Sequence, residues 1–139
     1  MAAFNKFNSF VLDVATKVHN LNTDLLKVML TNTQPVATNT IKANIAEIAA
    51  TNGYVTGGLV APFVSGLDPA GLYKLILSPV TFTAAGGSFP TFQFAVLYNS
   101  TPAAGNLIGW WDFGAPVILT NGNQFVWNPD AANGVLTLQ

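Results

Sequence analysis

The clearest periodic pattern in the chain lies at its N-terminus. From residue 4 to residue 18, apolar side chains recur at spacings of three and four, which places them on one face of a helix. Asn20 and Asn22 follow this stretch, and asparagine tolerates the left-handed backbone conformation that commonly ends a helix. The pattern therefore predicts a helix over residues 3–19. Its apolar face consists of Phe4, Phe7, Val11, Val14 and Val18.

The next part of the chain predicts one strand and one short helix. Residues 25–31 are almost continuously apolar and indicate a strand. Residues 32–40 are rich in Asn and Thr, which favour turns and loops. Residues 41–50 carry isoleucines at spacings of four and three, which predicts a short helix that ends at Asn52-Gly53.

From Tyr54 onward the pattern is typical of β-structure. Short apolar or alternating runs are separated by Gly, Pro and Asn, as in strands joined by turns. Asn121-Gly122 supplies the positive φ angles of a two-residue turn, so residues 117–120 and 124–127 are predicted to pair as a hairpin. The other strands predicted in this half are 72–79, 80–84, 92–98, 107–113 and 135–138.

Together these segments predict a single, mainly β domain over residues 1–139. We expect an N-terminal helix within residues 1–22 to cap a β-rich body of residues 23–139. The body is expected to be an antiparallel β-sandwich or flattened barrel, jelly-roll-like, with about six to eight strands. A chain of 139 residues is long enough to bury its own core.

Charge is scarce in this sequence. Only 8% of the residues are charged and 50% are hydrophobic, whereas about 25% of an ordinary globular domain is charged. A soluble monomer normally presents more charge to water. We therefore infer that much of the surface faces other protein, as in an assembly subunit.

The composition also limits the partners and cofactors. The absence of cysteine excludes disulfides and thiolate zinc sites. A net charge of −1 and scattered lysines predict no nucleic-acid binding, and no run approaches the roughly 20 apolar residues of a membrane span. The N-terminus is a poor match to a signal peptide, so we expect a product that stays in the cytosol where it is made.

His19 is the only imidazole available for acid–base chemistry. Asp13, Asp24 and Ser9 lie nearby in the sequence, but a triad needs base, carboxylate and nucleophile in register. A histidine at a helix end is favourable to the helix dipole. We therefore expect His19 to cap the helix or lie at the surface.

The carboxylates show no metal-ligand spacing, and neither a metal nor a cofactor is predicted. A calcium site built partly from backbone carbonyls is an open alternative. Asp112 and Asp130 are conceivable as a glycosidase pair. Turn and strand-end roles fit both residues better, and we expect no enzymatic activity.

Trp110-Trp111 is the most pointed local feature. On a strand the two indoles face opposite sides, so one should lie in the core and the other should reach a neighbouring subunit or a sugar. Equally, both faces of the sheet can be covered within the domain. Gly109 just before them would let another backbone approach. The predicted contact residues are Phe4, Phe7, Phe10, Trp110, Trp111, Phe113 and Trp127.

Several short segments occur in an order that resembles a family of small structural proteins of tailed bacteriophages. The resemblance extends from the N-terminus to about Thr120 and brings no catalytic residues with it. It implies a component of the virion, and a head decoration, or cement, protein is favoured. The segments are residues 4–10, 19–21, 25–38, 47–50, 52–54, 56–58, 95–99 and 107–112.

Three functions follow from these observations, in order of preference. The first is a capsid decoration protein that binds the outside of the head as a dimer or trimer and ties major capsid protein subunits together. The second is a tail, connector or fibre-base subunit of the same virion. The third is a carbohydrate-binding β-sandwich that uses Trp111 or Trp127 as a stacking platform.

Overall fold

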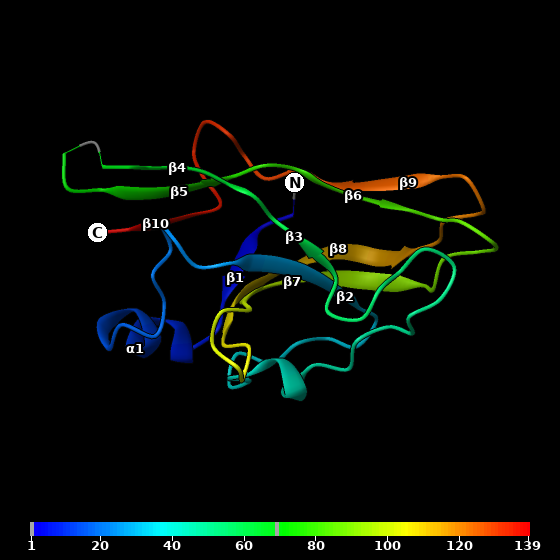
Figure 1. Cartoon of the computed structure of the whole chain (residues 1–139), viewed down its shortest axis with the longest axis horizontal. Helices are drawn as coiled ribbons and strands as arrows, with labels where there is room; N and C mark the ends of the chain where they lie inside the picture. The colour runs from blue at the N-terminus through cyan, green and yellow to red at the C-terminus, as the bar shows by residue number, and fades with distance from the viewer. Residues whose placement is uncertain (1, 69) are drawn as a thin grey trace.

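The largest sheet of the protein has five antiparallel strands in the order β1-β8-β7-β2-β3. The structure is a computed structural model that describes residues 2–68 and 70–139. In Figure 1 this sheet forms the lower layer. Its strands are β1 (Phe4–Lys6), β8 (Leu107–Val117), β7 (Phe92–Asn99), β2 (Leu26–Thr31) and β3 (Leu59–Val60).

Two smaller antiparallel sheets make up the facing layer. One has three strands in the order β10-β5-β4, and the other pairs β6 with β9. The chain runs from β5 into β6 through Ser78-Pro79, so the two small sheets lie end to end above the large one (Figure 1). The result is the expected β-sandwich-like fold. The strands are β4 (Phe63–Leu67), β5 (Tyr73–Leu77), β6 (Val80–Thr83), β9 (Gln124–Trp127) and β10 (Leu136–Leu138).

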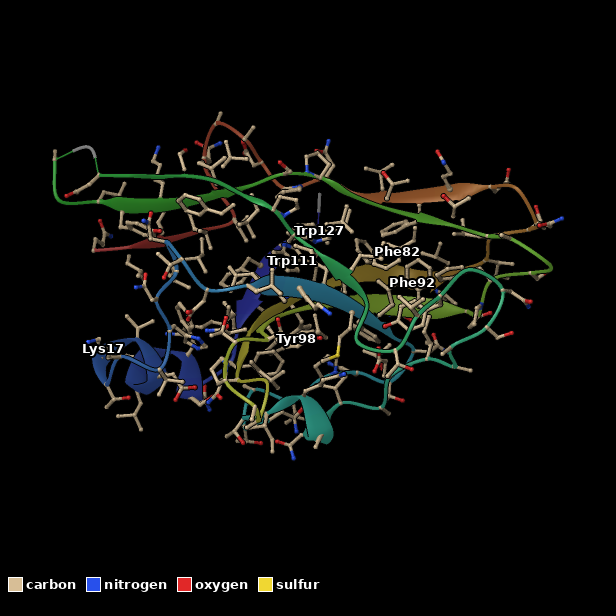
Figure 2. All side chains as sticks on the ribbon, in the orientation of Figure 1. Lys17, Phe82, Phe92, Tyr98, Trp111 and Trp127 are labelled. Atoms are coloured by element: carbon tan, nitrogen blue, oxygen red, sulfur yellow. The ribbon has the colours of Figure 1, made fainter. Side chains whose placement is uncertain are left out.

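The five-stranded sheet buries apolar side chains on both of its faces. The main core lies between the two layers, where Phe82, Phe92, Trp111 and Trp127 meet (Figure 2). A smaller cluster lies on the opposite face, between the sheet and the segment that carries the 3₁₀ turn η1 (Lys42–Asn44). The smaller cluster consists of Phe7, Met29, Val96, Tyr98 and Leu107, with Ile45 and Trp110 packed against it.

The two tryptophans of β8 lie on opposite faces, as predicted. Trp111 is buried in the main core, and Trp110 packs against Phe7 on the other face with ring centroids 4.6 Å apart. Because Gly109 has no side chain, strand β1 can lie close to it, as was expected of a glycine at this position. The ring of Phe4 and the carbonyl oxygen of Asn5 occupy the space that a Cβ atom would need.

The prediction of a helix over residues 3–19 is wrong at both ends. The helix α1 spans only Ser9–Ala15, and Phe4–Lys6 form β1 on the edge of the large sheet. Pairing with β8 satisfies backbone groups and buries Phe4 against Trp111, which outweighs the helical spacing. Lys17 has a positive φ of 65° and turns the chain away before residue 19. The large sheet therefore begins within the segment expected to be helical.

Two further predictions differ from the structure. Within residues 41–50 only Lys42–Asn44 form a 3₁₀ turn, since Ile48 donates a hydrogen bond to Leu30 of β2 instead of continuing a helix. Asn121-Gly122 does form a turn, but residues 117–120 and 124–127 do not pair. Strand β9 pairs with β6 instead, an arrangement that buries Trp127 in the main core.

The remaining predicted strands are confirmed, and short edge pieces raise the total in the described residues to ten. β1 and β3 are pieces of this kind, too short to give a sequence pattern. No helix in the described ranges is long and apolar enough to cross a membrane. The confirmed segments are 25–31, 72–79, 80–84, 92–98, 107–113 and 135–138.

We expect Gly109→Ala to lower the free energy of unfolding by about 1–3 kcal/mol, the usual cost of overpacking. The new Cβ atom would collide with the Phe4 ring and lie 2.7 Å from the carbonyl oxygen of Asn5. Chemical denaturation followed by tryptophan fluorescence measures the change. Thr81→Ala, at an exposed position of β6, is the control and should stay within about 0.5 kcal/mol of the parent. Equal stability of the two variants would contradict the packing of β1 on β8.

Candidate functional site

Most of the predicted contact residues lie inside the chain. Phe7, Phe10, Trp111 and Trp127 are each at most 3% exposed. Trp111 and Trp127 pack edge to face with ring centroids 5.1 Å apart, so neither offers a free face on which a sugar could stack. The chain covers these four side chains itself, because its large sheet is packed on both faces. They are therefore not surface contact residues in this structure.

The other predicted contact residues are partly exposed but do not form one patch. Phe113 packs against Phe125 at a centroid distance of 5.1 Å in the main core. Trp110 belongs to the opposite face of the sheet. Phe4 lies on the edge strand β1, where it lines a groove described below. Of the predicted residues, Phe4 and the buried Phe10 therefore line this groove, and Phe4 and the buried Trp111 line a neighbouring cavity of about 230 Å³.

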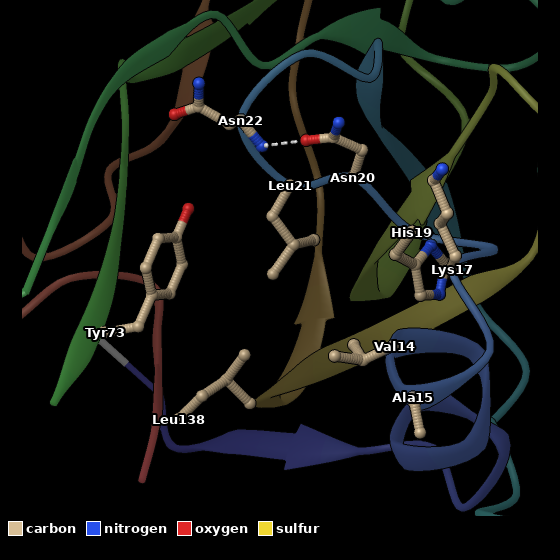
Figure 3. A pocket seen from close by; sticks show the side chains of 9 residues that line it. All are labelled: Val14, Ala15, Lys17, His19, Asn20, Leu21, Asn22, Tyr73 and Leu138. Carbon is tan, nitrogen blue, oxygen red and sulfur yellow. Dashed lines mark hydrogen bonds between the residues drawn. The ribbon is translucent and has the colours of Figure 1, made fainter. Parts of the chain in front are cut away.

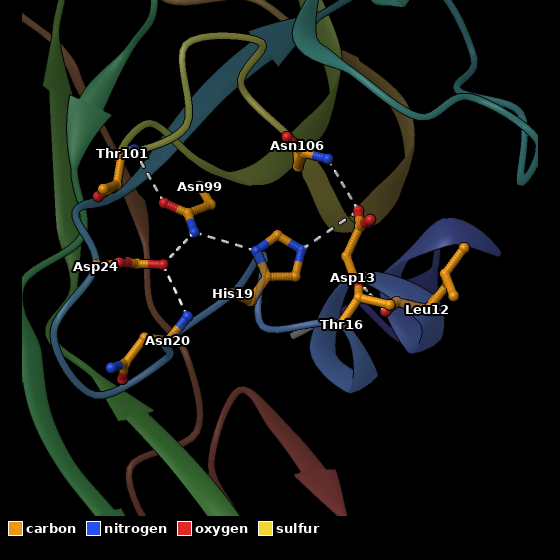
Figure 4. A network of polar contacts seen from close by, with 9 residues as sticks. All are labelled: Leu12, Asp13, Thr16, His19, Asn20, Asp24, Asn99, Thr101 and Asn106. Carbon is orange, nitrogen blue, oxygen red and sulfur yellow. Dashed lines mark hydrogen bonds and ion pairs between the residues drawn. The ribbon is translucent and has the colours of Figure 1, made fainter.

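His19 is buried in a polar cluster between α1 and the ends of β2 and β7 (Figure 4). Its Nε2 lies 3.7 Å from Asp13 Oδ2, and its Nδ1 lies 3.1 Å from the amide nitrogen of Asn99. Because that amide donates, Nδ1 accepts and Nε2 carries the hydrogen. The expectation that His19 caps the helix or lies at the surface is wrong. Asn99 extends from β7 and also donates to Asp24, which closes the cluster.

The hydrogen bonds of the His19 cluster connect different segments of the chain. They do not bring a nucleophile into contact with the imidazole. Asp13 accepts a hydrogen bond from Asn106 Nδ2 at 3.1 Å, and Asp24 accepts one from the Asn20 backbone at 2.8 Å. The hydroxyl of Ser9 is buried and makes no hydrogen bond to His19. Burial lowers the pKa of His19, although the nearby charges of Asp13 and Asp24 oppose that shift. Neutral His19 is therefore the form that the fold holds.

Asp130 has the turn role that was expected of it, whereas Asp112 lies inside strand β8 and not at a turn or a strand end. Asp112 accepts hydrogen bonds of 2.8 Å from Gln93 Nε2 and from the Gly114 backbone. Asp130 accepts from the backbone of Ala132 and from Asn133. These hydrogen bonds lower the pKa of both carboxyl groups, so both are ionised at neutral pH. Neither is prepared to act as a general acid.

Glu47 anchors the long segment that covers the lower face of the sheet, a role that the sequence did not indicate. Its Oε1 accepts hydrogen bonds from the Tyr54 hydroxyl and the Gly57 backbone, and Lys42 Nζ lies 3.9 Å from its Oε2. Tyr98 from β7 donates to the Gly57 carbonyl at 2.7 Å. Burial raises the pKa of Tyr98 to about 12. These contacts hold the segment against the smaller apolar cluster.

A groove of about 560 Å³ runs along the open side of the sandwich, between β1 and β10. β1 contributes Phe4 and Lys6, and α1 contributes Phe10 and Val11. The other wall is the continuous run of residues 133–139. Successive residues of a strand point to opposite faces, so a wall of consecutive residues means that the groove follows the edge of β10. We call this feature the β1/β10 groove.

The opposite side of the sandwich is closed by the chain itself. β3 of the large sheet continues into β4 of the facing layer through Ala61-Pro62. The Ala61 N–H donates to Leu26, and the carbonyl of Pro62 accepts from Ser78. Those hydrogen bonds join both layers to the crossover. β1 and β10 have no such connection, and residues of both strands line the groove between them.

The surroundings of the β1/β10 groove are apolar and partly exposed. Val11 is 55% exposed and Leu12 is 64% exposed on the outer side of α1. A second cavity of about 320 Å³ lies on the other side of Leu138, between α1 and Tyr73 (Figure 3). Lys17 and His19 also line this cavity. Exposed apolar side chains and an open strand edge therefore occur together at this end of the molecule.

No protein-family model, curated protein sequence or solved structure matches this chain. Among the described residues, no three His, Cys, Asp or Glu side chains gather closely enough to hold a metal ion. The candidate site is therefore argued from its own geometry, and the β1/β10 groove is the strongest candidate. Sequence reasoning missed Lys6, Val11 and Leu138 as groove residues, although the edge strand at 135–138 was a usable signal.

The His19 cluster predicts a pH-dependent stability. The unfolded chain protonates His19 near pH 6.5, whereas burial lowers the pKa of the folded state. The unfolded state therefore binds more protons below pH 6.5, and the free energy of unfolding falls as the pH drops through this value toward the folded-state pKa. Denaturant unfolding between pH 8 and pH 5, measured in steps of about half a pH unit, follows this loss.

His19→Gln is the matched control, since it keeps a polar side chain but does not titrate. His19 is the sole histidine of the chain, so the variant should lose the pH dependence in this window. Identical slopes for the parent and the variant would contradict the assigned role of His19.

Proposed function

We propose that this chain is a non-enzymatic structural protein of a tailed bacteriophage particle. In the specific form of the proposal it is a decoration protein. It binds the outside of the head as a dimer or trimer and bridges neighbouring major capsid protein subunits. The observation that carries the proposal is a sparsely charged, partly apolar surface around an open sheet edge, which suits contact with protein more than chemistry on a small substrate.

The scarcity of charge supports contact with protein. With 8% charged residues, few ions would have to be desolvated when a large surface is covered, and an unpaired buried ion is costly. Exposed apolar residues occur on several elements. They include Val11 and Leu12 on α1, Val64 on β4 and Val126 on β9. Many weak contacts of this kind, repeated over a symmetric shell, would add up through multivalency.

The roles of the polar residues in the fold point the same way. His19 and Asp13 connect α1 to the loops, and Glu47 anchors the long segment below the sheet. Asp130 stabilises a turn, and Asp112 connects β8 to Gln93 of β7. Of these residues, His19, Asp13, Asp112 and Asp130 were the candidates for chemistry, and each has a structural task. The resemblance to virion structural proteins adds the expectation of a particle as the setting.

The copy number of the chain in purified phage particles tests the proposal. Quantitative mass spectrometry against the major capsid protein should give a near-stoichiometric ratio, because decoration proteins occupy symmetry-related positions over the whole shell. A handful of copies per particle would contradict decoration and favour a tail, connector or fibre-base subunit. Absence of the chain from particles would contradict the virion role altogether.

A further inference from the structure

We propose that the β1/β10 groove receives an extended segment of the major capsid protein, which adds as a strand to the edge of β1, with β10 as the opposite wall. This inference rests on the proposed function and names the contact through which it would act. Strand addition to an exposed sheet edge is a common mode of peptide recognition, with backbone hydrogen bonds giving affinity and side-chain pockets giving specificity.

The backbone of β1 has hydrogen-bonding groups that point into the groove. Phe7 donates to the carbonyl of Ile108, and the register pairs Asn5 with Trp110 and Lys6 with Gly109. In an antiparallel pair, alternate residues turn their N–H and C=O toward the partner strand. The backbone N–H and C=O groups of Asn5 and Phe7 therefore face β8. The N–H and C=O groups of the alternate residues, Phe4 and Lys6, face away from β8 and are free to pair with a further strand.

β10 offers the second edge. It pairs on one side with β5 and is the terminal strand of the order β10-β5-β4. Its residues Leu136 to Leu138 all line the groove, so the unpaired edge itself is the wall. An unpaired edge is a ready template for another strand. A single extended segment paired with β1 would therefore lie against the edge of β10 as its opposite wall.

The lining of the groove defines the chemistry of the segment. Phe4, Val11 and Leu138 offer apolar contacts, which suit a strand with apolar side chains at alternate positions. Lys6 is the single charged side chain among the lining residues, and it forms no ion pair within the described part of the chain. A carboxylate on the segment near Lys6 would complement this charge.

A second copy of the chain is a weaker occupant than the capsid protein. A folded copy presents its strands within sheets, whereas the space between two edges suits a single extended segment. The long loop of residues 32–41 does not supply one, because Asn8 donates to Ala37 and Leu107 donates to Thr40 within the same chain. The observations therefore favour an extended segment from a different protein.

Lys6→Pro tests the strand addition. Proline removes the groove-facing N–H and places its ring at the edge, and it is tolerated on an edge strand where no ladder hydrogen bond is lost. Lys6→Gln keeps the N–H and removes only the charge. Binding of each purified variant to shells assembled from the major capsid protein alone is measured by co-sedimentation. We expect Lys6→Pro to bind about tenfold or more weakly, and Lys6→Gln at most about fivefold more weakly.

A second pair of variants keeps the test independent of how β1 folds. Val11→Glu places a carboxylate on the groove wall, and Val36→Glu changes a residue of similar exposure, 57% against 55%, that does not line the groove. Val11→Glu should weaken shell binding about tenfold through repulsion of an acidic segment and lost apolar contact. Val36→Glu should bind like the parent.

The outcomes separate this inference from the proposed function. If the parent chain does not bind the shells, the decoration role fails. If it binds and both groove variants bind as well as their controls, the role survives and the strand addition is overturned. Sedimentation velocity of the chain alone tests whether a second copy of the chain occupies the groove. A parent dimer that Lys6→Pro converts to monomer, with shell binding unchanged, would assign the groove to a second copy and overturn the proposal.

Discussion

The burial of the five-stranded sheet on both faces is the constraint on which the rest of the structure depends. Strand β7 is buried along most of its length, with Ala95 and Leu97 toward the facing layer and Val96 and Tyr98 toward the other side. Such a sheet is stable in water when something covers each face. The two small sheets cover one face, and the segment held by Glu47 covers the other.

This constraint explains why Trp111 and Trp127 are buried and Trp110 is only partly exposed. Trp111 and Trp127 fill the space between the layers, and Trp110 covers Phe7 on the far side. Few polar groups are left for chemistry, and the most buried of them, around His19, connects the helix to the sheet. The surface combines few charges with exposed apolar residues on several elements and with the open edges of β1 and β10.

The fold class and most strands could be predicted because alternating and continuous apolar runs reflect burial directly. The opposite placement of Trp110 and Trp111 followed from strand geometry alone. The errors arose where tertiary pairing overrides local spacing: residues 4–6 pair with β8 despite a helical pattern, and β9 pairs with β6 instead of its neighbour in sequence. The groove was out of reach because it depends on two distant edges, β1 and β10, being brought together.

The account centres on the β1/β10 groove as the surface through which the chain contacts a particle. A cryo-electron microscopy map of the particle with the chain attached tests this claim most directly. The account predicts continuous density for an additional strand between β1 and β10, contributed by a neighbouring capsid subunit. An empty groove, with the chain attached through another face such as the outer side of β6 and β9, would contradict it.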